Sequence, residues 1–167
     1  MRYTPAAIAL SLLAAVTSSV GYGAERVPDP RAVALVEEGR SALASGDVQG
    51  AIDSFEAALT IDPGHTAIFI DLADAARQQG LQGKAIKYYR EALEHEPANL
   101  AAISGEGEAL VEKGAVEKAR RNLSRLESLC GSGCDESRQL AAAIQQGPQA
   151  PVLAAEAVTV EPIVAKN

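Results

Sequence analysis

The sequence predicts an all-α fold, an α-solenoid of about three helix–turn–helix repeats followed by one capping helix. Two regularities predict it. A helix-breaking glycine recurs every 34 residues, and a small residue lies seven positions before each copy, in the pairs Gly39 and Gly46, Ala73 and Gly80, and Gly107 and Gly114. Proline closes the first two copies at Pro63 and Pro97, each after an acidic residue, where a helix cannot continue. This period suits two short helices and their turns, and stacking the copies would bury their apolar faces.

Two further columns lie in the expected second helix of each copy. One holds small residues and the other bulky apolar ones, in the pairs Ala51 and Phe55, Ala85 and Tyr89, and Ala119 and Leu123. A 34-residue unit with these columns and a terminal proline resembles the tetratricopeptide repeat family, over about residues 32–129. The resemblance departs from the family pattern at Glu38 and Glu106, where leucine is usual. Three unrelated helical hairpins are the alternative.

Residues 1–24 have the pattern of a signal peptide. Arg2 precedes an apolar run from Ala6 to Val16, which is too short to cross the roughly 30 Å of a bilayer. The small residues that follow the run fit cleavage after Gly21, Gly23 or Ala24. We therefore expect a periplasmic protein with no stable membrane span after cleavage. Secretion, or anchoring in the membrane by an uncleaved signal, are the alternatives.

The rest of the chain divides by the repeat. Residues 25–31 are expected to form a linker and the start of the first helix, opened by Asp29 and Pro30. The three repeats then occupy residues 32–65, 66–99 and 100–131. Residues 132–147 hold the capping helix, expected to begin with Asp135 as its cap and to end at Gln146. Residues 148–167 are predicted to be a disordered tail, with a strand at 157–161 that pairs with a partner's sheet as the alternative.

The composition and the motifs of the sequence argue against several classes of function. The formal net charge is −7 and the pI is about 4.9, an acidic balance that argues against nucleic acid as a partner. No Gly-x-Ser-x-Gly elbow, phosphate loop or dinucleotide fingerprint is present in the sequence, so neither catalysis nor a cofactor is expected. The expected core consists of large apolar side chains of the second helices: Phe55, Leu59, Ile86, Tyr89, Leu93, Leu123 and Leu126.

The family resemblance implies that the first helices of the hairpins line a concave face that binds a peptide. The residues expected to point into this groove are Val36, Arg40, Leu43, Ile70, Asp74, Arg77, Gln78, Glu108, Val111 and Glu112. Its arginines would bind carboxylates or carbonyls, its acids basic side chains, and its aliphatic residues an apolar anchor. Solvated helix residues without a ligand are the alternative. The paired asparagines and lysines of chaperone-binding clamps do not occur here, so a chaperone C-terminal motif is not the expected ligand.

Cys130 and Cys134 flank Gly-Ser-Gly, where the third copy lacks its proline. Export to an oxidising compartment favours a disulfide that fixes the angle of the capping helix. This ending resembles that of short exported tetratricopeptide proteins of proteobacteria, which implies no activity. The alternative is a thiol-redox or copper-handling site, because the spacing resembles Sco-type copper proteins and thiolates suit Cu(I). His65 and His95 lie in inter-repeat turns without an obvious route to the cysteines, so no metal site is expected.

The sequence therefore favours a non-enzymatic, exported scaffold or adaptor for an unidentified protein or peptide. Self-association through the exposed ends of the stack is a further possibility. If the two groove arginines only contact the partner, Arg40→Ala combined with Arg77→Ala should weaken capture and leave the melting temperature nearly unchanged.

Overall fold

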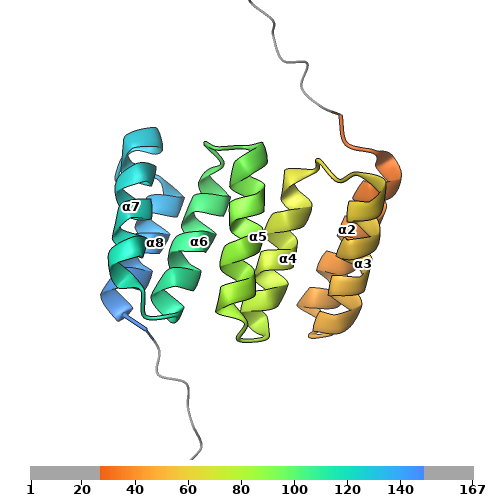
Figure 1. Cartoon of the computed structure of the whole chain (residues 1–167), viewed down its shortest axis with the longest axis horizontal. Helices are drawn as coiled ribbons and strands as arrows, with labels where there is room; N and C mark the ends of the chain where they lie inside the picture. Colours follow the sequence, from red (N-terminus) through yellow and green to blue (C-terminus); the bar gives the residue numbers. More distant parts are fainter. Residues whose placement is uncertain (1–26, 149–167) are drawn as a thin grey trace, which may run out of the picture.

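The computed structural model describes residues 27–148, which form seven helices joined by short turns and contain no strand (Figure 1). The helices are α2 (Pro30–Ala44), α3 (Val48–Ile61), α4 (Thr66–Gln78), α5 (Gln82–His95), α6 (Leu100–Glu112), α7 (Val116–Cys130) and α8 (Asp135–Gln146). Hairpins α2/α3, α4/α5 and α6/α7 stack side by side, and α8 packs on the last of them. The all-α solenoid is confirmed. The expected signal peptide and nearly all of the expected tail lie outside the described residues.

The turn inside each hairpin has the same geometry. Gly46, Gly80 and Gly114 have φ values of 87°, 72° and 82°, in the left-handed region that favours glycine. The amide after each glycine reaches back to a carbonyl five residues earlier, as when the Asp47 amide donates to Ala42. These bonds satisfy carbonyls at the end of the first helix, so the recurring glycine ends that helix as the 34-residue period predicts.

Helix starts follow the expected caps with two exceptions. Asp29, Asp47 and Asn99 each accept a hydrogen bond from a backbone N–H of the first turn. The expected cap at Asp135 is wrong, because Cys134 holds the cap position of α8 and Asp135 pairs with Arg138 instead. Helix α5 begins at Gln82 rather than Lys84.

The core consists of two clusters of buried residues, one around α2, α3 and the start of α4, the other from α4 to α8. Phe55, Ile86, Tyr89 and Leu126 are buried as predicted. The other three expected core residues, Leu59, Leu93 and Leu123, are only partly buried and pack against the edges of these clusters. Alanine fills most of the remaining core positions, which lets the helices approach closely.

The small-residue column marks the tightest helix contacts. A Cβ atom added at Gly39 would lie 2.5 Å from the Phe55 ring, and one at Gly107 would lie 2.5 Å from Leu140. A methyl group has no room at either position, since ordinary contacts begin near 3.4 Å. The sequence therefore places these small residues where a side chain of another helix crosses.

We expect Gly39→Ala to lower the free energy of unfolding by about 1–2 kcal/mol. The added methyl overpacks the fully buried Phe55 ring, at a cost only partly offset by the higher helix propensity of alanine. Gly83→Ala on α5 is the matched control, because a Cβ there meets no atom closer than 3.8 Å. It should be neutral or stabilising by up to about 1 kcal/mol. Urea unfolding of both variants gives the comparison, and equal effects would contradict the packing described.

Glu106 is one of the two departures from the family pattern. It lies on the side of α6 that faces the core, and hydrogen bonds satisfy its buried carboxylate. It is 7% exposed, and its carboxylate accepts hydrogen bonds from Arg90 at 2.7 Å and from Asn122 at 3.0 Å. A buried carboxylate with these two donors is compatible with the fold. The polar residue thus joins α6 to α5 and α7 where leucine would pack.

A search of the described residues for helices long and apolar enough to cross a membrane finds none.

Candidate functional site

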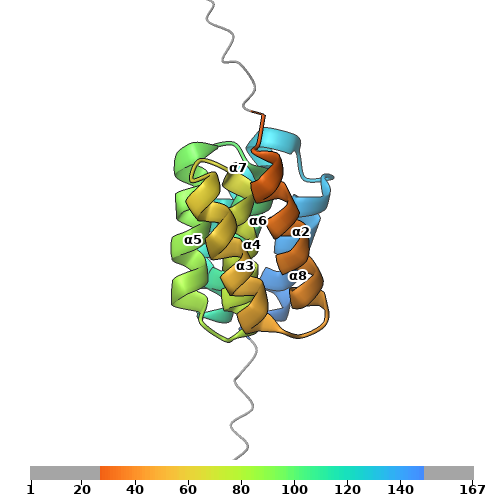
Figure 2. The same cartoon turned by 90° about the vertical axis from the view of Figure 1, so that its right-hand side faces the viewer.

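The helices form two layers. The first-helix layer consists of α2, α4, α6 and α8, and neighbouring members of this series contact one another. The second-helix layer consists of α3, α5 and α7. Figure 2 looks along the stack, with α2 and α8 on the right and α5 on the left. Helix α8 therefore does more than cover the last repeat: it continues the first-helix layer by one more helix.

Hollow A lies on the first-helix layer, between α4, α6 and α8. It has a volume of about 230 Å³. Its lining residues are Ile70, Asp74, Arg77, Tyr89, Ala101, Ser104, Gly105, Glu108, Glu136 and Gln139. Three carboxylates and one guanidinium thus surround a small apolar floor.

Hollow B lies next to hollow A, at the N-terminal ends of α4 and α6. It has a volume of about 240 Å³ and shares Ile70 with hollow A. Its lining residues are Pro28, Asp62, Gly64, His65, Thr66, Ala67, Ile70, Glu96 and Asn99. The two hollows share the Ile70 side chain, so they lie side by side on the first-helix layer. We call the two together the groove below.

The two predicted groove arginines are already paired within the chain. Arg40 on α2 donates to Asp71 on α4 at 3.0 Å. Arg77 on α4 binds Glu108 at 2.9 Å and also Glu112, both on α6. Each arginine therefore links one repeat to the next. Since either substitution breaks an inter-repeat ion pair, we now expect the loss of these arginines to lower the melting temperature rather than leave it unchanged.

Burial governs the protonation of these groups. Burial is the largest single influence and would lower the pKa of Arg77, but its hydrogen bond to Glu112 and its interactions with Tyr89 and Glu108 together outweigh burial, and the pKa is raised. Asp71 and Asp74 are affected in the opposite sense, because burial raises the pKa of each carboxyl although Arg40 and the Tyr89 hydroxyl donate to them. Burial, followed by the nearby Asp74 charge, also raises the pKa of Tyr89. Arg77 thus stays charged, and Asp74 takes up a proton more readily than an exposed aspartate does.

We expect these raised carboxyl pKa values to appear in the pH dependence of stability. A carboxyl group whose folded pKa is raised stabilises the fold when it is protonated. This contribution to the free energy of unfolding is fully present below the unfolded pKa of about 3.8 and is lost as pH rises through the higher folded pKa. The free energy of unfolding of the wild type, relative to Asp74→Asn, should therefore rise as the pH is lowered from pH 7 to pH 4, close to the unfolded pKa. Urea unfolding at both pH values measures it, with Asp53→Asn on the exposed face of α3 as the control. A constant difference between wild type and Asp74→Asn would contradict the burial of this carboxyl.

The ten predicted groove residues separate into three groups. Ile70, Asp74, Arg77 and Glu108 line hollow A, Glu112 lies beside it as a partner of Arg77, and Arg40 pairs with Asp71 next to it. Gln78 is exposed but lines neither hollow, and Leu43 packs against the core.

Val36 and Val111 do not face the groove, and their assignment to it is wrong. They are 2% and 3% exposed. Val36 lies on the same side of α2 as Ala32 and Gly39, which faces α3 and α4. Val111 is buried because α4, α5, α7 and α8 all contact α6. Neither side chain has surface left for a ligand.

Sequence reasoning missed six residues that line hollow A: Tyr89, Ala101, Ser104, Gly105, Glu136 and Gln139. Tyr89 comes from the second-helix layer, where it was expected only as core. Its ring lies against Gly105 and its hydroxyl donates to Asp74. Glu136 and Gln139 come from α8, and treating α8 only as a cap hid them. Leu140 gave the available signal, because it lies 34 residues after Glu106 and so continues the column of Leu72 and Glu106 in the first helices.

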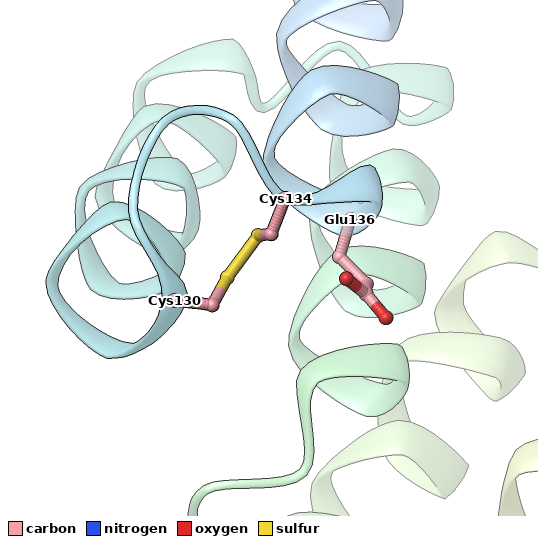
Figure 3. Close-up of side chains that lie close together, drawn as sticks. All are labelled: Cys130, Cys134 and Glu136. Atoms are coloured by element: carbon pink, nitrogen blue, oxygen red, sulfur yellow. A yellow bond between two sulfur atoms is a disulfide. The ribbon is translucent and has the colours of Figure 1, made fainter.

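The structure joins Cys130 and Cys134 in a disulfide between the last residue of α7 and the cap of α8 (Figure 3). The Glu136 side chain lies next to it, and its carboxylate and the two sulfurs fall within 4.8 Å of one another. The histidines lie elsewhere: His65 lines hollow B, and His95 stacks on Phe69 with 5.3 Å between ring centroids. Among the described residues, then, no histidine joins the cysteines.

The comparisons with known proteins identify the repeat. The tetratricopeptide repeat family model matches residues 7–66, 36–98 and 70–127. No curated protein matches.

Solved structures agree in fold. The Sgt2 TPR domain from Aspergillus fumigatus has a TM-score of 0.65 at 24% identity, covering 80% of this chain and 95% of that one. The first TPR of Spaghetti (RPAP3), bound to the HSP90 peptide SRMEEVD, has a TM-score of 0.63 at 22% identity, covering 70% and 91%. The TPR2B domain of yeast Sti1, in a pHsp70 complex, has a TM-score of 0.64 at 19% identity, covering 71% and 98%. With its repeats matched by the family model over most of its length, this chain belongs to the tetratricopeptide repeat family.

Proposed function

We propose that this protein is a non-enzymatic adaptor that is exported to the periplasm and binds a peptide segment of another protein in the groove. The observation that carries the proposal is that hollows A and B lie side by side on the first-helix layer and share the Ile70 side chain. Two adjacent hollows, with a few polar groups and an apolar contact between them, suit an extended peptide better than a compact small molecule. Family membership supports a binding role, since the Spaghetti (RPAP3) and Sti1 domains were solved with peptide or protein ligands.

Site-specific photo-crosslinking in the envelope fraction tests the proposal. A photoreactive phenylalanine derivative would replace Ala101 or Gln139, two exposed residues that line hollow A. Matched controls carry it at Lys87 on α5 or Arg121 on α7, exposed residues of the second-helix layer. We expect a discrete crosslinked product from the two groove positions only. Equal products from both layers, or products from the control positions alone, would contradict binding in the groove.

We propose that the disulfide is structural and sets the direction in which α8 leaves α7. Only three residues separate the cysteines, and α8 supplies Glu136 and Gln139 to hollow A. The thiol-redox or copper-handling alternative rests on the short distances between Cys130, Cys134 and Glu136. Both sulfurs are bonded to each other, however, and the thiolates that bind Cu(I) exist only after reduction.

Thiol titration of freshly purified protein separates these two roles of the cysteines. A structural disulfide predicts no titratable thiol and no bound copper. Two thiols, or one equivalent of Cu(I), would support the alternative. Self-association stays a prediction, and light scattering of the purified chain gives its mass.

A further inference from the structure

We infer that hollow A takes a lysine or arginine side chain of the bound peptide, while hollow B takes the neighbouring part of its backbone. This inference rests on the proposed function and specifies its ligand. The fold that this chain shares with its relatives does not determine which ligand chemistry the groove selects.

Hollow A keeps a negative charge after its side chains have made their contacts within the chain. Asp74, Glu108 and Glu136 face a single cation, Arg77. Arg77 is already bound by Glu108 and by Glu112, which is also held by Gln82 at 2.9 Å. Its guanidinium therefore has little capacity left for a ligand carboxylate. The hollow as a whole is negative.

Within the described residues, the Glu136 carboxylate has no partner for its charge. The backbone carbonyl of Glu136 lies 3.3 Å from the Ser104 hydroxyl, but its carboxylate makes no hydrogen bond or ion pair with the described residues. Asp74 has one neutral donor, the Tyr89 hydroxyl, and is largely withdrawn from water. A peptide cation placed between these two carboxylates would gain charge-assisted hydrogen bonds from both.

Hollow B offers a hydrogen-bond acceptor that does not depend on the charges of hollow A. The Nδ1 atom of His65 is buried and has no hydrogen-bond partner among the described residues. In the neutral imidazole one ring nitrogen is an acceptor, so a backbone N–H of the peptide would satisfy Nδ1. Ile70 lies between hollows A and B and offers an apolar contact to the chain that joins them.

The groove thus selects against the kind of peptide that a structural relative binds. The Spaghetti (RPAP3) domain was solved with SRMEEVD, a peptide in which three of the last four residues are acidic. Such an end would bring carboxylates towards Asp74 and Glu136 and would be repelled. Similar folds therefore present opposite preferences.

A displayed library of random heptapeptides, selected on the immobilised full chain, tests the inference. We expect the enriched peptides to share lysine or arginine at one position. In a synthetic copy, replacing an enriched arginine with neutral, nearly isosteric citrulline should weaken binding about tenfold or more. Binding of the arginine peptide should also weaken as salt is raised from 0.1 to 0.5 M, because this change about halves the electrostatic screening length.

Three variants assign the effect to the residues named. Asp74→Asn combined with Glu136→Gln should remove most of the preference for arginine over citrulline. His65→Phe should weaken both peptides by a similar factor and leave the preference intact. Asp53→Asn combined with Glu127→Gln, on the exposed second-helix layer, is the charge-matched control and should change neither.

The outcomes separate this inference from the proposed function. Enriched peptides that are neutral or acidic, yet lose binding in the His65→Phe variant, would overturn the cation subsite and leave the groove as the binding site. Peptides whose binding survives all groove substitutions, or a library without enrichment together with no crosslinks from Ala101 or Gln139, would overturn both. An equal affinity for the arginine and citrulline peptides also overturns the cation subsite.

Discussion

Phe55→Ala is expected to lower the free energy of unfolding by about 3–5 kcal/mol. Phe55 is fully buried between α2, α3 and α4, and its ring fills the space that Gly39 leaves open. Truncation removes the ring's burial and leaves a cavity that close-packed helices cannot fill. Since domains of this kind are stable by only about 5–15 kcal/mol, the loss is a large fraction of the total. Urea unfolding followed by the helical circular dichroism signal measures it.

Phe69→Ala is the matched control, because it removes the same ring from a half-buried position. Phe69 packs on the edge of the second core cluster and stacks on His95. We expect this variant to lose only about 1–2 kcal/mol, in proportion to the smaller apolar area that Phe69 buries. An equal loss of unfolding free energy in the two variants would mean that Phe55 does not occupy the centre of the core cluster formed by α2, α3 and α4.

Arg77→Ala is expected to lower the free energy of unfolding by about 2 kcal/mol. The side chain of Arg77 is 23% exposed and that of Glu108 is 12% exposed, so loss of the cation leaves largely buried carboxylates without their main partner. The remaining exposure lets water offset part of the cost, which keeps the effect below that of a fully buried pair. Thermal and urea unfolding of the variant give the value.

Arg40→Ala is the comparison, since the same residue type joins the preceding pair of repeats. The Arg40 side chain is 46% exposed, and water can replace more of its interaction with Asp71. We expect a loss of about 1 kcal/mol or less, and a double variant close to the sum, because the two ion pairs share no residue. A melting temperature unchanged in all three variants would show that the inter-repeat ion pairs do not stabilise the stack.

The fold could be predicted from the sequence because the signals that set it are local. Gly46, Gly80 and Gly114 recur at positions where the backbone must turn left-handed, so their spacing gives the hairpins directly. Gly39 and Gly107 mark close helix contacts for the same kind of reason. Each of these glycines acts through one backbone conformation or one close contact. Both kinds of constraint recur in every repeat and therefore appear as a period in the sequence.

The site could be predicted only in part because it depends on how the helices rotate and on which neighbours cover them. Ile70, Asp74, Arg77 and Glu108 line hollow A as expected, but Val36 and Val111 face the core. The 34-residue period fixes equivalent positions in each repeat without saying how many helices surround each one. Helix α6 has four neighbours, and its equivalent positions are therefore more buried than those of α2.

The ion pairs escaped prediction for a related reason. Arg40 and Arg77 were expected to bind a ligand, yet each finds its carboxylate on the next first helix, 31 residues along the chain in both cases. A long arginine side chain reaches across the layer to the neighbouring helix, and only the stacked arrangement shows which acid it meets. Glu136 was missed because α8 was expected to cover the stack, whereas it extends the groove.

Mapping a bound peptide onto the chain by nuclear magnetic resonance tests the central claim most directly. An enriched heptapeptide would be titrated into the full isotope-labelled chain while the backbone amides are followed. We predict saturable shifts at Ala101, Ser104, Gly105 and Gln139 around hollow A, and none along the exposed faces of α3, α5 and α7. Shifts confined to the second-helix layer, with the amides around hollow A unchanged, would contradict binding in the groove.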